Sequence, residues 1–247
     1  MSFMCWNVWG LGNQRTVQEL AKFVWAQDPS VLFLAETWAD EVRPKRLCDE
    51  LQYDEVWVVR QVTRAGSLAL FWKNSVDMEV DLASLNHINA IINKGKADAW
   101  RFTGIYGFPK VGRKAETWEL LRGLSQKFNL PWICTGDFNE ILRSHEKIGG
   151  APRRESDMNS FRDVVDECGL VDLGFVGHKF TWRGRRSGGV VLERLDRAFT
   201  SDSWLEKNPA TRVQHIRAHS SNHNPIIIKP EGIVACRNKS SALNKCG

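Results

Sequence analysis

The stretch that decides the fold of this chain reads Trp132-Ile133-Cys134-Thr135-Gly136-Asp137-Phe138-Asn139. It opens with a short, mostly apolar run, which is typical of a strand buried on both faces of a sheet. Asp137 and Asn139 follow where that strand is expected to end. An unpaired polar group beside a core is costly, and α/β folds place their sites at strand ends. We therefore treat Asp137 and Asn139 as candidate site residues.

Outside this stretch, apolar runs of strand length alternate with helical patterns. Strands are expected at residues 3–8, 31–35, 56–59, 68–72, 78–82, 87–92, 100–106, 132–135, 213–216 and 225–228. Helices are expected after an N-cap at Asn13, around residues 47–51 and 118–128, and from an N-cap at Ser156 to Gly169. A hairpin turn is expected at residues 64–67, with 68–72 and 78–82 as the strands around it, and another at residues 93–96. Strands outnumber helices and hairpins mix with crossovers, which favours an α/β fold of packed mixed sheets with helices outside.

The composition suits one large domain. The chain has 247 residues, 43% of them hydrophobic, and a net charge of +5, which permits a polyanionic partner without requiring one. We expect a single domain over residues 1–230 and a disordered polar tail over residues 231–247. The sequence shows no Cys-x-x-Cys pair, no basic-then-apolar leader and no apolar run of membrane length. These features predict an intracellular protein with reduced cysteines, and they indicate neither a membrane association nor a protein partner.

The tetrapeptide Gly136-Asp137-Phe138-Asn139 has a functional and a structural interpretation. In an extended segment Asp137 and Asn139 point to the same side, and Phe138 points to the other. A carboxylate can take a proton from water, and an amide can donate to a developing oxyanion. An Asx-turn after a strand would use the same residues without any chemistry. The tetrapeptide alone leaves both interpretations open.

Further polar residues follow other expected strands. Asn7, Glu36 and Tyr106 end or follow the strands that begin near residues 3, 31 and 100. Each also has a structural interpretation, as a cap or as a hydrogen-bonded ring. Nearer the end of the chain, Asp196 and His223 could be surface groups, or a pair in which the carboxylate fixes the tautomer of the imidazole.

Together these residues form an ordered series of motifs. The series comprises Cys5-Trp6-Asn7, Ala35-Glu36-Thr37, Ile105-Tyr106-Gly107, Gly136-Asp137-Phe138-Asn139, Arg194-Leu195-Asp196-Arg197 and Ser221-Asn222-His223. The series resembles the endonuclease/exonuclease/phosphatase superfamily. Longer stretches resemble the endonuclease domain of plant non-LTR retrotransposons of the long interspersed type, namely Trp6-Asn7-Val8-Trp9-Gly10-Leu11-Gly12, Leu68-Ala69-Leu70-Phe71-Trp72, Trp100-Arg101-Phe102-Thr103-Gly104 and Lys179-Phe180-Thr181-Trp182.

This resemblance implies a four-layer α/β sandwich, with two mixed β-sheets packed face to face and flanked by helices. It also implies a metal-dependent phosphodiesterase, in which Glu36, helped by Asn7, holds Mg²⁺ or Mn²⁺. In that scheme Asp137 would orient or deprotonate the attacking water. Asn139 and Tyr106 would contact the scissile phosphate, and Asp196 would pair with a phosphate-binding His223. Hard oxygen ligands suit Mg²⁺, which agrees with this assignment.

The chain departs from the superfamily pattern at one position. Asn222 stands where the resemblance calls for an aspartate, so one negative charge beside the expected metal is missing. The reverse transcriptase that follows in such elements does not follow here, which suggests a truncated or decaying copy. The leading prediction is a DNA endonuclease that nicks one strand, weakened by Asn222. The alternatives are an inactive nucleic-acid-binding remnant, or a phosphatase or apurinic-site endonuclease on the same fold.

A basic stretch favours DNA as the partner and hence a nuclear location. Between residues 179 and 197, basic residues outnumber acidic ones, and glycines are expected to loosen the segment into a flexible loop. The candidate DNA contacts within it are Trp182, Arg183, Arg185 and Arg186. Basic and aromatic side chains suit a phosphate backbone and a base face. A solvated loop without a partner would show the same charge pattern.

Overall fold

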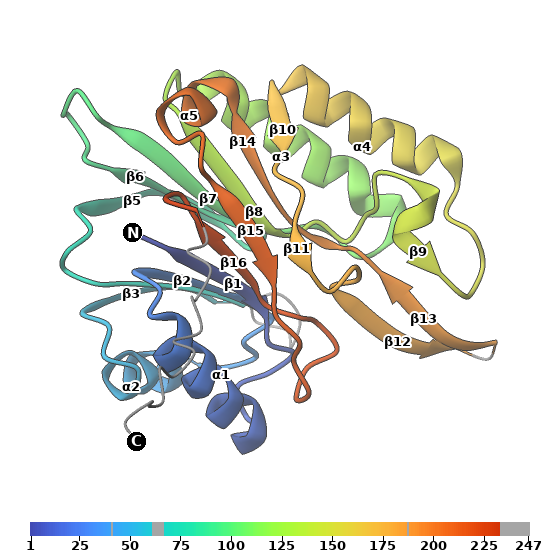
Figure 1. The fold of residues 1–247 in the computed structure, drawn as a ribbon, viewed down its shortest axis with the longest axis horizontal. Helices are drawn as coiled ribbons and strands as arrows, with labels where there is room; N and C mark the ends of the chain where they lie inside the picture. The colour runs from blue at the N-terminus through green and yellow to red at the C-terminus, as the bar shows by residue number, and fades with distance from the viewer. Residues whose placement is uncertain (41, 61–66, 187, 233–247) are drawn as a thin grey trace, which may run out of the picture.

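In the computed structural model, which describes residues 1–40, 42–60, 67–186 and 188–232, two large sheets pack face to face (Figure 1). In order across it, the seven-stranded sheet contains β11 (Val176–Gly177), β15 (Arg212–His215), β16 (Ile226–Lys229), β1 (Phe3–Asn7), β2 (Val31–Ala35), β4 (Leu68–Trp72) and β3 (Glu55–Val59). The six-stranded sheet contains β10 (Leu170–Asp172), β14 (Asp196–Ser201), β8 (Trp132–Asp137), β7 (Trp100–Tyr106), β6 (His87–Ile92) and β5 (Met78–Ser84).

Helices cover the outer face of each sheet, which completes four layers (Figure 1). The helices α1 (Gln14–Gln27) and α2 (Val42–Glu50) pack on the seven-stranded sheet, and α3 (Lys114–Lys127) and α4 (Glu155–Glu167) pack on the six-stranded sheet. A short helix, α5 (Asp202–Lys207), follows β14. The expected four-layer sandwich is therefore confirmed. Within the described residues, no helix is both long enough and apolar enough to cross a membrane.

Both sheets are mixed, as expected. β1 pairs with β2 in parallel and with β16 antiparallel, while β8 pairs with β7 in parallel and with β14 antiparallel. Successive residues of β1 face opposite layers: Phe3 packs between the sheets, and Met4 packs under the helices. Because both faces of the central strands are buried, these strands read as continuous apolar runs.

Several sequence-based boundaries were wrong. α4 begins at Glu155 after Arg154, so Ser156 lies in its first turn and is not its N-cap. The strands 68–72 and 78–82, expected to form a hairpin with the turn at residues 64–67, lie in different sheets: β4 pairs with β2 and β3, and β5 pairs with β6. Residues 64–66 of that expected turn lie outside the described residues, as does the expected tail from residue 233 onward.

A small third sheet was not expected. It joins β12 (Trp182–Arg186), β13 (Gly189–Glu193) and β9 (Lys147–Ile148), and its β12–β13 hairpin extends from one edge of the sandwich (Figure 1). The stretch expected to be a flexible loop is thus largely a paired hairpin. Glycine content misled the prediction, because glycines also permit close packing within a strand.

The interface between the two large sheets depends on a glycine. A Cβ atom added at Gly104 in β7 would lie 2.3 Å from Cδ2 of Phe33 in β2. Gly104→Ala should therefore lower the free energy of unfolding by about 1–3 kcal/mol through overpacking, measured by urea denaturation. Gly123→Ala is the matched control, since Gly123 lies in α3 with no atom within 4 Å of its added Cβ. Because alanine favours a helix, Gly123→Ala should unfold at the parent's urea concentration or above it. If Gly104→Ala does the same, the proposed close packing is wrong.

Candidate active site

The candidate residues meet at one edge of the sandwich because of strand direction. Asn7 ends β1 and Asp137 ends β8, and each of these strands runs parallel to a neighbour in its own sheet. Asp196 begins β14, which is antiparallel to β8, and His223 lies just before β16, which is antiparallel to β1. Parallel strands contribute their ends and antiparallel strands their beginnings, so residues far apart in the sequence lie at the same edge.

The amide of Asn7 joins carboxylates from the two sheets. Its Nδ2 donates to Glu36 Oε1 at 3.0 Å and to Asp137 Oδ2 at 3.0 Å. The hydroxyl of Tyr106 donates to the same Glu36 oxygen at 2.8 Å. Burial and the Glu36 carboxylate raise the pKa of Tyr106 far above its usual value, so the hydroxyl remains a hydrogen-bond donor at neutral pH.

His223 lies between two carboxylates. Its Nδ1 is 2.8 Å from Asp196 Oδ2, and its Nε2 is 3.6 Å from Asp137 Oδ2. Burial favours the neutral imidazole, but the carboxylates of Asp196 and Asp137 outweigh burial and raise the pKa of His223 to about 9. Burial in turn raises the pKa of Asp137 above its usual range, although His223 opposes that shift. The carboxylates therefore favour the cationic form of the imidazole, and the Asp137 carboxyl group holds a proton more readily than an ordinary aspartate does.

The structure confirms the Asx-turn interpretation of the tetrapeptide at Asp137, and the functional interpretation stays a prediction. Asn139 N donates to Asp137 Oδ1 at 2.8 Å, which is an Asx-turn, and Asn139 Nδ2 donates to the carbonyl oxygen of Gly107 at 2.8 Å. Phe138 points into the core, where it is 1% exposed. Asn139 and Glu36 both have left-handed backbone angles, with φ of 55° and 52°. Such angles are uncommon outside glycine and occur often at functional sites.

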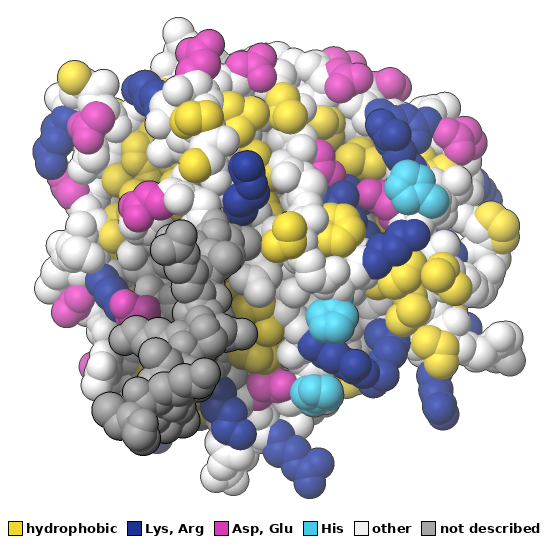
Figure 2. Space-filling view, viewed as in Figure 1, with side chains coloured by type: hydrophobic (Ala, Val, Ile, Leu, Met, Phe, Trp, Pro, Cys, Tyr) yellow, Lys and Arg dark blue, Asp and Glu magenta, His cyan; other side chains and the backbone are white. Residues whose placement is uncertain are grey.

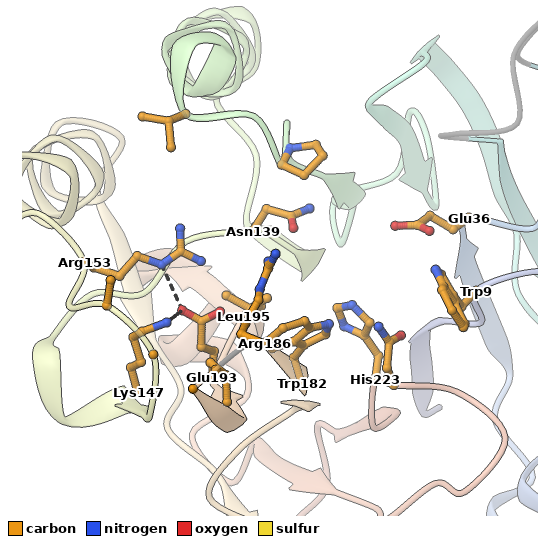
Figure 3. Close-up of a pocket in the computed structure, with 17 residues that line it drawn as sticks. Trp9, Glu36, Asn139, Lys147, Arg153, Trp182, Arg186, Glu193, Leu195 and His223 are labelled. Atoms are coloured by element: carbon orange, nitrogen blue, oxygen red, sulfur yellow. Dashed lines mark hydrogen bonds and ion pairs between the residues drawn. The ribbon is translucent and has the colours of Figure 1, made fainter. Parts of the chain in front are cut away.

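Two oxygen atoms near the site are suited to a cation. Asn222 Oδ1 is buried and has no hydrogen-bond partner among the described residues. The hydrogen bonds that Glu36 accepts within the described chain both end on Oε1, which leaves Oε2 open. Glu36, Asn222 and His223 line one open pocket of about 970 Å³ (Figure 3). Hard oxygen donors of this kind fit Mg²⁺ or Mn²⁺.

A second group could also hold a metal. Ligand atoms of Asp137, Asp196 and His223 all lie within 4.8 Å of one another. Their oxygens already accept hydrogen bonds from Asn7, Asn139 and His223. A cation there would have to displace those bonds, so we favour the Glu36 side of the pocket.

The basic hairpin is attached directly to the segment that carries His223. Arg183 N donates to the carbonyl oxygen of Asn222 at 2.9 Å, and Asn224 N donates to the carbonyl oxygen of Thr181 at 2.7 Å. An isolated bridge pairs Trp182 with His223. A substrate bound on the hairpin would therefore be held in register with His223.

The residues expected to contact DNA do not all lie on one face, because successive side chains of β12 point to opposite faces of the hairpin. Arg186 lines the pocket with His223 (Figure 3), and Arg183 lines a groove on the other face of the hairpin, while Trp182 lines both. Arg185 is exposed. Basic side chains gather over β12 and over the segment between β15 and β16 (Figure 2). The residues of that groove that can carry positive charge are His178, Lys179, Arg183, Arg217 and His219.

Two arginines of the same stretch are not available to a partner. Arg197 is fully buried and pairs with Glu146 and with Asp172, the latter at 2.7 Å. Arg194 is 6% exposed and pairs with the same two carboxylates. Counting charge along the sequence overstated the basic surface, because the sequence does not show which arginines have buried partners.

Several supporting residues were missed by sequence reasoning. Thr181 Oγ1 accepts from the backbone nitrogens of Leu195 and Asp196, each at 2.9 Å. Ser221 Oγ donates to the carbonyl oxygen of Asn7 at 2.9 Å and accepts from His223 N at 3.0 Å. Both hydroxyls connect segments that are distant in sequence. Only their places inside Lys179-Phe180-Thr181-Trp182 and Ser221-Asn222-His223 could have indicated them.

Fold and site together define a four-layer α/β sandwich with carboxylates, an imidazole and amides at the edge where its sheets meet. The sequence profile of the Endonuclease/Exonuclease/phosphatase family matches residues 4–215, so the chain belongs to that family. No curated protein is significantly similar to the chain in sequence.

Solved structures share the fold at low sequence identity. The endonuclease domain of TRAS1, a telomere-specific non-LTR retrotransposon, is 16% identical with a TM-score of 0.69, covering 92% of this chain and 96% of that one. The 3'-5' exonuclease NExo from Neisseria meningitidis is 17% identical with a TM-score of 0.71, covering 93% and 99%. An AP endonuclease from Archaeoglobus fulgidus is 14% identical with a TM-score of 0.73, covering 93% and 98%.

The two possible metal positions can be separated by binding measurements with Mn²⁺. Glu36→Gln should weaken Mn²⁺ binding at least about 10-fold, and Asn222→Asp should strengthen it about 10-fold, because each changes the negative charge beside the open oxygens. Asp196→Asn should leave the affinity near that of the parent protein. Isothermal titration calorimetry checks all three variants. Loss of binding in Asp196→Asn together with normal binding in Glu36→Gln would place the cation in the Asp137 group instead.

Proposed function

We propose that this chain is a divalent-metal-dependent phosphodiesterase that nicks DNA. The observation that carries the proposal is the buried array in which Asp137 contacts Asn7, Asn139 and His223, next to the pocket that Asn139 and His223 line. A buried carboxyl group with a raised pKa, beside a cationic imidazole and amide donors, is typical of a hydrolytic site. The family supports this proposal, because its named activities are those of nucleases and phosphatases.

In the proposed reaction, the Asp137 carboxylate orients a water molecule and takes its proton as the water oxygen bonds to phosphorus and the ester P–O bond breaks. His223, held by Asp196 in its cationic form, donates from Nε2 to a phosphate oxygen. The amide of Asn139 and the hydroxyl of Tyr106 position the phosphate. Glu36, with Asn222 and helped by Asn7, would hold the cation. Bound there, a divalent cation neutralises phosphate charge and stabilises the leaving alkoxide.

DNA is the substrate that the surroundings of the pocket favour. Trp182 and Arg186 of the hairpin line the pocket itself, and further basic groups lie on the other face of the hairpin. Positive charge spread on both sides of a strand suits the continuous phosphate backbone of a polymer better than a single small phosphate. Of the similar structures, the 3' phosphatase NExo is described bound to a product DNA hairpin. Cleavage of genomic DNA would place this protein in the nucleus.

A second candidate function is DNA binding without cleavage, and Asn222 favours it. Its uncharged oxygen would hold a cation more weakly than a carboxylate would. The other residues expected at the site are all present, so we rank binding without cleavage below the metal-dependent enzyme. A 3' phosphatase or an AP endonuclease, activities named for two similar structures, would use the same array on other DNA ends or sites.

Nicking of supercoiled plasmid DNA tests the proposed reaction. The parent protein should nick in Mg²⁺ or Mn²⁺ and should not nick in EDTA. Asp137→Asn and Glu36→Gln should each abolish nicking, because one removes the proton acceptor and the other the metal-binding charge. Asn222→Asp should raise the rate and lower the Mg²⁺ concentration needed for half-maximal activity. Undiminished nicking by a clean preparation in EDTA would exclude the mechanism. DNA binding without nicking by parent and Asn222→Asp alike would establish the inactive remnant.

The basic hairpin should contact the DNA backbone. Replacing Arg183, Arg185 and Arg186 together by Ala should weaken binding to any sequence and flatten its salt dependence by about one unit of log–log slope for each lost phosphate contact. Arg186→Ala alone should also reduce nicking, because this side chain lines the pocket. Arg46→Ala, an exposed arginine on α2, is the matched control. Fluorescence anisotropy over a salt series measures these slopes. A triple variant with the parent slope would mean that the hairpin is only solvated surface.

A further inference from the structure

Two tryptophans are exposed side by side, and one of them, Trp9, lines the pocket. Trp9 is 53% exposed and Trp38 is 42% exposed. Their ring centroids lie 5.6 Å apart, and the rings are tilted by 59°. Exposed aromatic pairs of this size are uncommon unless they have a partner, because indole rings bury large apolar areas when they can.

The backbone under this pair is fixed in an unusual conformation. Trp9 and Trp38 have left-handed φ angles of 50° and 47°. Trp9 N donates to Asn7 Oδ1 at 3.2 Å, and Trp38 N donates to Ser67 Oγ at 2.8 Å. Gly10 N donates to the carbonyl oxygen of Glu36 at 2.8 Å, which joins the two segments. The hydrogen bonds hold conformations that are otherwise unfavourable, which is common where strain serves a function.

A glycine leaves the space in which Trp38 lies. Gly10 has a φ of 99°, and a Cβ atom built on it would lie 2.7 Å from Cε3 of Trp38. Any other residue at this position would push the indole away. The missing Cβ lets Trp38 pack beside Trp9 in the absence of a partner, which reduces the rotamer entropy lost on binding.

The pair lies beside the groups assigned to the phosphate. Trp9 lines the pocket together with Glu36, Asn139 and His223. Figure 3 shows Trp9 on one side of His223 and Trp182 on the other. A partner that meets both the indoles and these polar groups must carry a flat apolar face close to an anion. A nucleotide has both parts.

We propose that Trp9 and Trp38 form a stacking platform for an unpaired nucleobase next to the phosphate that is cut. The inference rests on the proposed function and refines its substrate to DNA that is single-stranded or locally melted at the site of cleavage. A paired base inside a duplex offers no free face, because its neighbours cover both sides. An unpaired base offers one, and stacking on an aromatic side chain is worth ~1–3 kcal/mol per base.

Binding is measured in the Asp137→Asn background so that cleavage does not interfere. Two DNAs of the same sequence are compared by fluorescence anisotropy in Mg²⁺: a full duplex, and a duplex with a central unpaired segment. Trp9→Ala and Trp38→Ala should each weaken binding to the unpaired DNA by ~5–150-fold, the range that the stacking energy predicts. Each should change the affinity for the full duplex by less than about 2-fold, because a paired base has no free face to stack on the indoles. Trp25→Ala is the matched control, since Trp25 is 67% exposed on α1 and should affect neither DNA.

A second measurement reports the stacking itself. The fluorescence of 2-aminopurine at an unpaired position should be quenched when the Asp137→Asn protein binds, and the quenching should be lost in Trp9→Ala. Duplex binding at the parent level shows that the variants are folded. Equal weakening on both DNAs, or no weakening on the unpaired DNA, overturns the platform. Failure of the proposed function would instead show as absent nicking by the parent protein, whatever the tryptophan variants bind.

Discussion

The site depends on the hydrogen bonds that the amide of Asn7 donates to Glu36 and Asp137, because these carboxylates come from different sheets. Two carboxylates at the end of a sandwich would repel one another if nothing lay between them. Asn7 supplies one donor to each, and the imidazole of His223 supplies the positive charge that Asp137 and Asp196 require. The edge where the sheets meet is therefore held together by the same polar groups that form the candidate active site. This explains how three carboxylates can converge there beside a hydrophobic core.

The sequence predicted much of the fold and of the candidate site, for a physical reason. The central strands are buried on both faces, so they read as unbroken apolar runs, and the polar residue that ends each run marks the edge of the sheet. Asn7 and Asp137 were found in this way, and β1 and β8 end at those residues. An apolar run does not show in which direction its strand runs in the sheet. That direction decides which strand ends lie at the same edge. Pairing Asp196 with His223 rested on resemblance for that reason, and the 2.8 Å contact between them connects one sheet to a loop of the other.

Features that depend on pairing between distant segments could not be predicted. Burial alternates along the strands of the β12–β13 hairpin, but polar and apolar residue types do not alternate with it, so the sequence lacks the pattern that marks a half-buried strand. Gly184 was interpreted as a source of flexibility, yet a Cβ there would lie 2.3 Å from the ring of Trp182. Arg194 and Arg197 look like solvated charges in the sequence, but they are buried against Glu146 and Asp172. Such networks fix the base of the hairpin, and hence the place of Trp182 and Arg186 beside His223.

We propose that hydrolysis uses a water molecule directed by Asp137, and the fate of that water can be followed. A nicking reaction in water enriched in ¹⁸O should place one ¹⁸O atom in the terminal phosphate of each nick, detected by mass spectrometry of the digested ends. Incorporation should accompany every nick made by the parent protein in Mg²⁺ and should disappear with nicking in Asp137→Asn. Nicks that form in Mg²⁺ without ¹⁸O in the phosphate would contradict the account, because the strand would then break without attack of water on phosphorus.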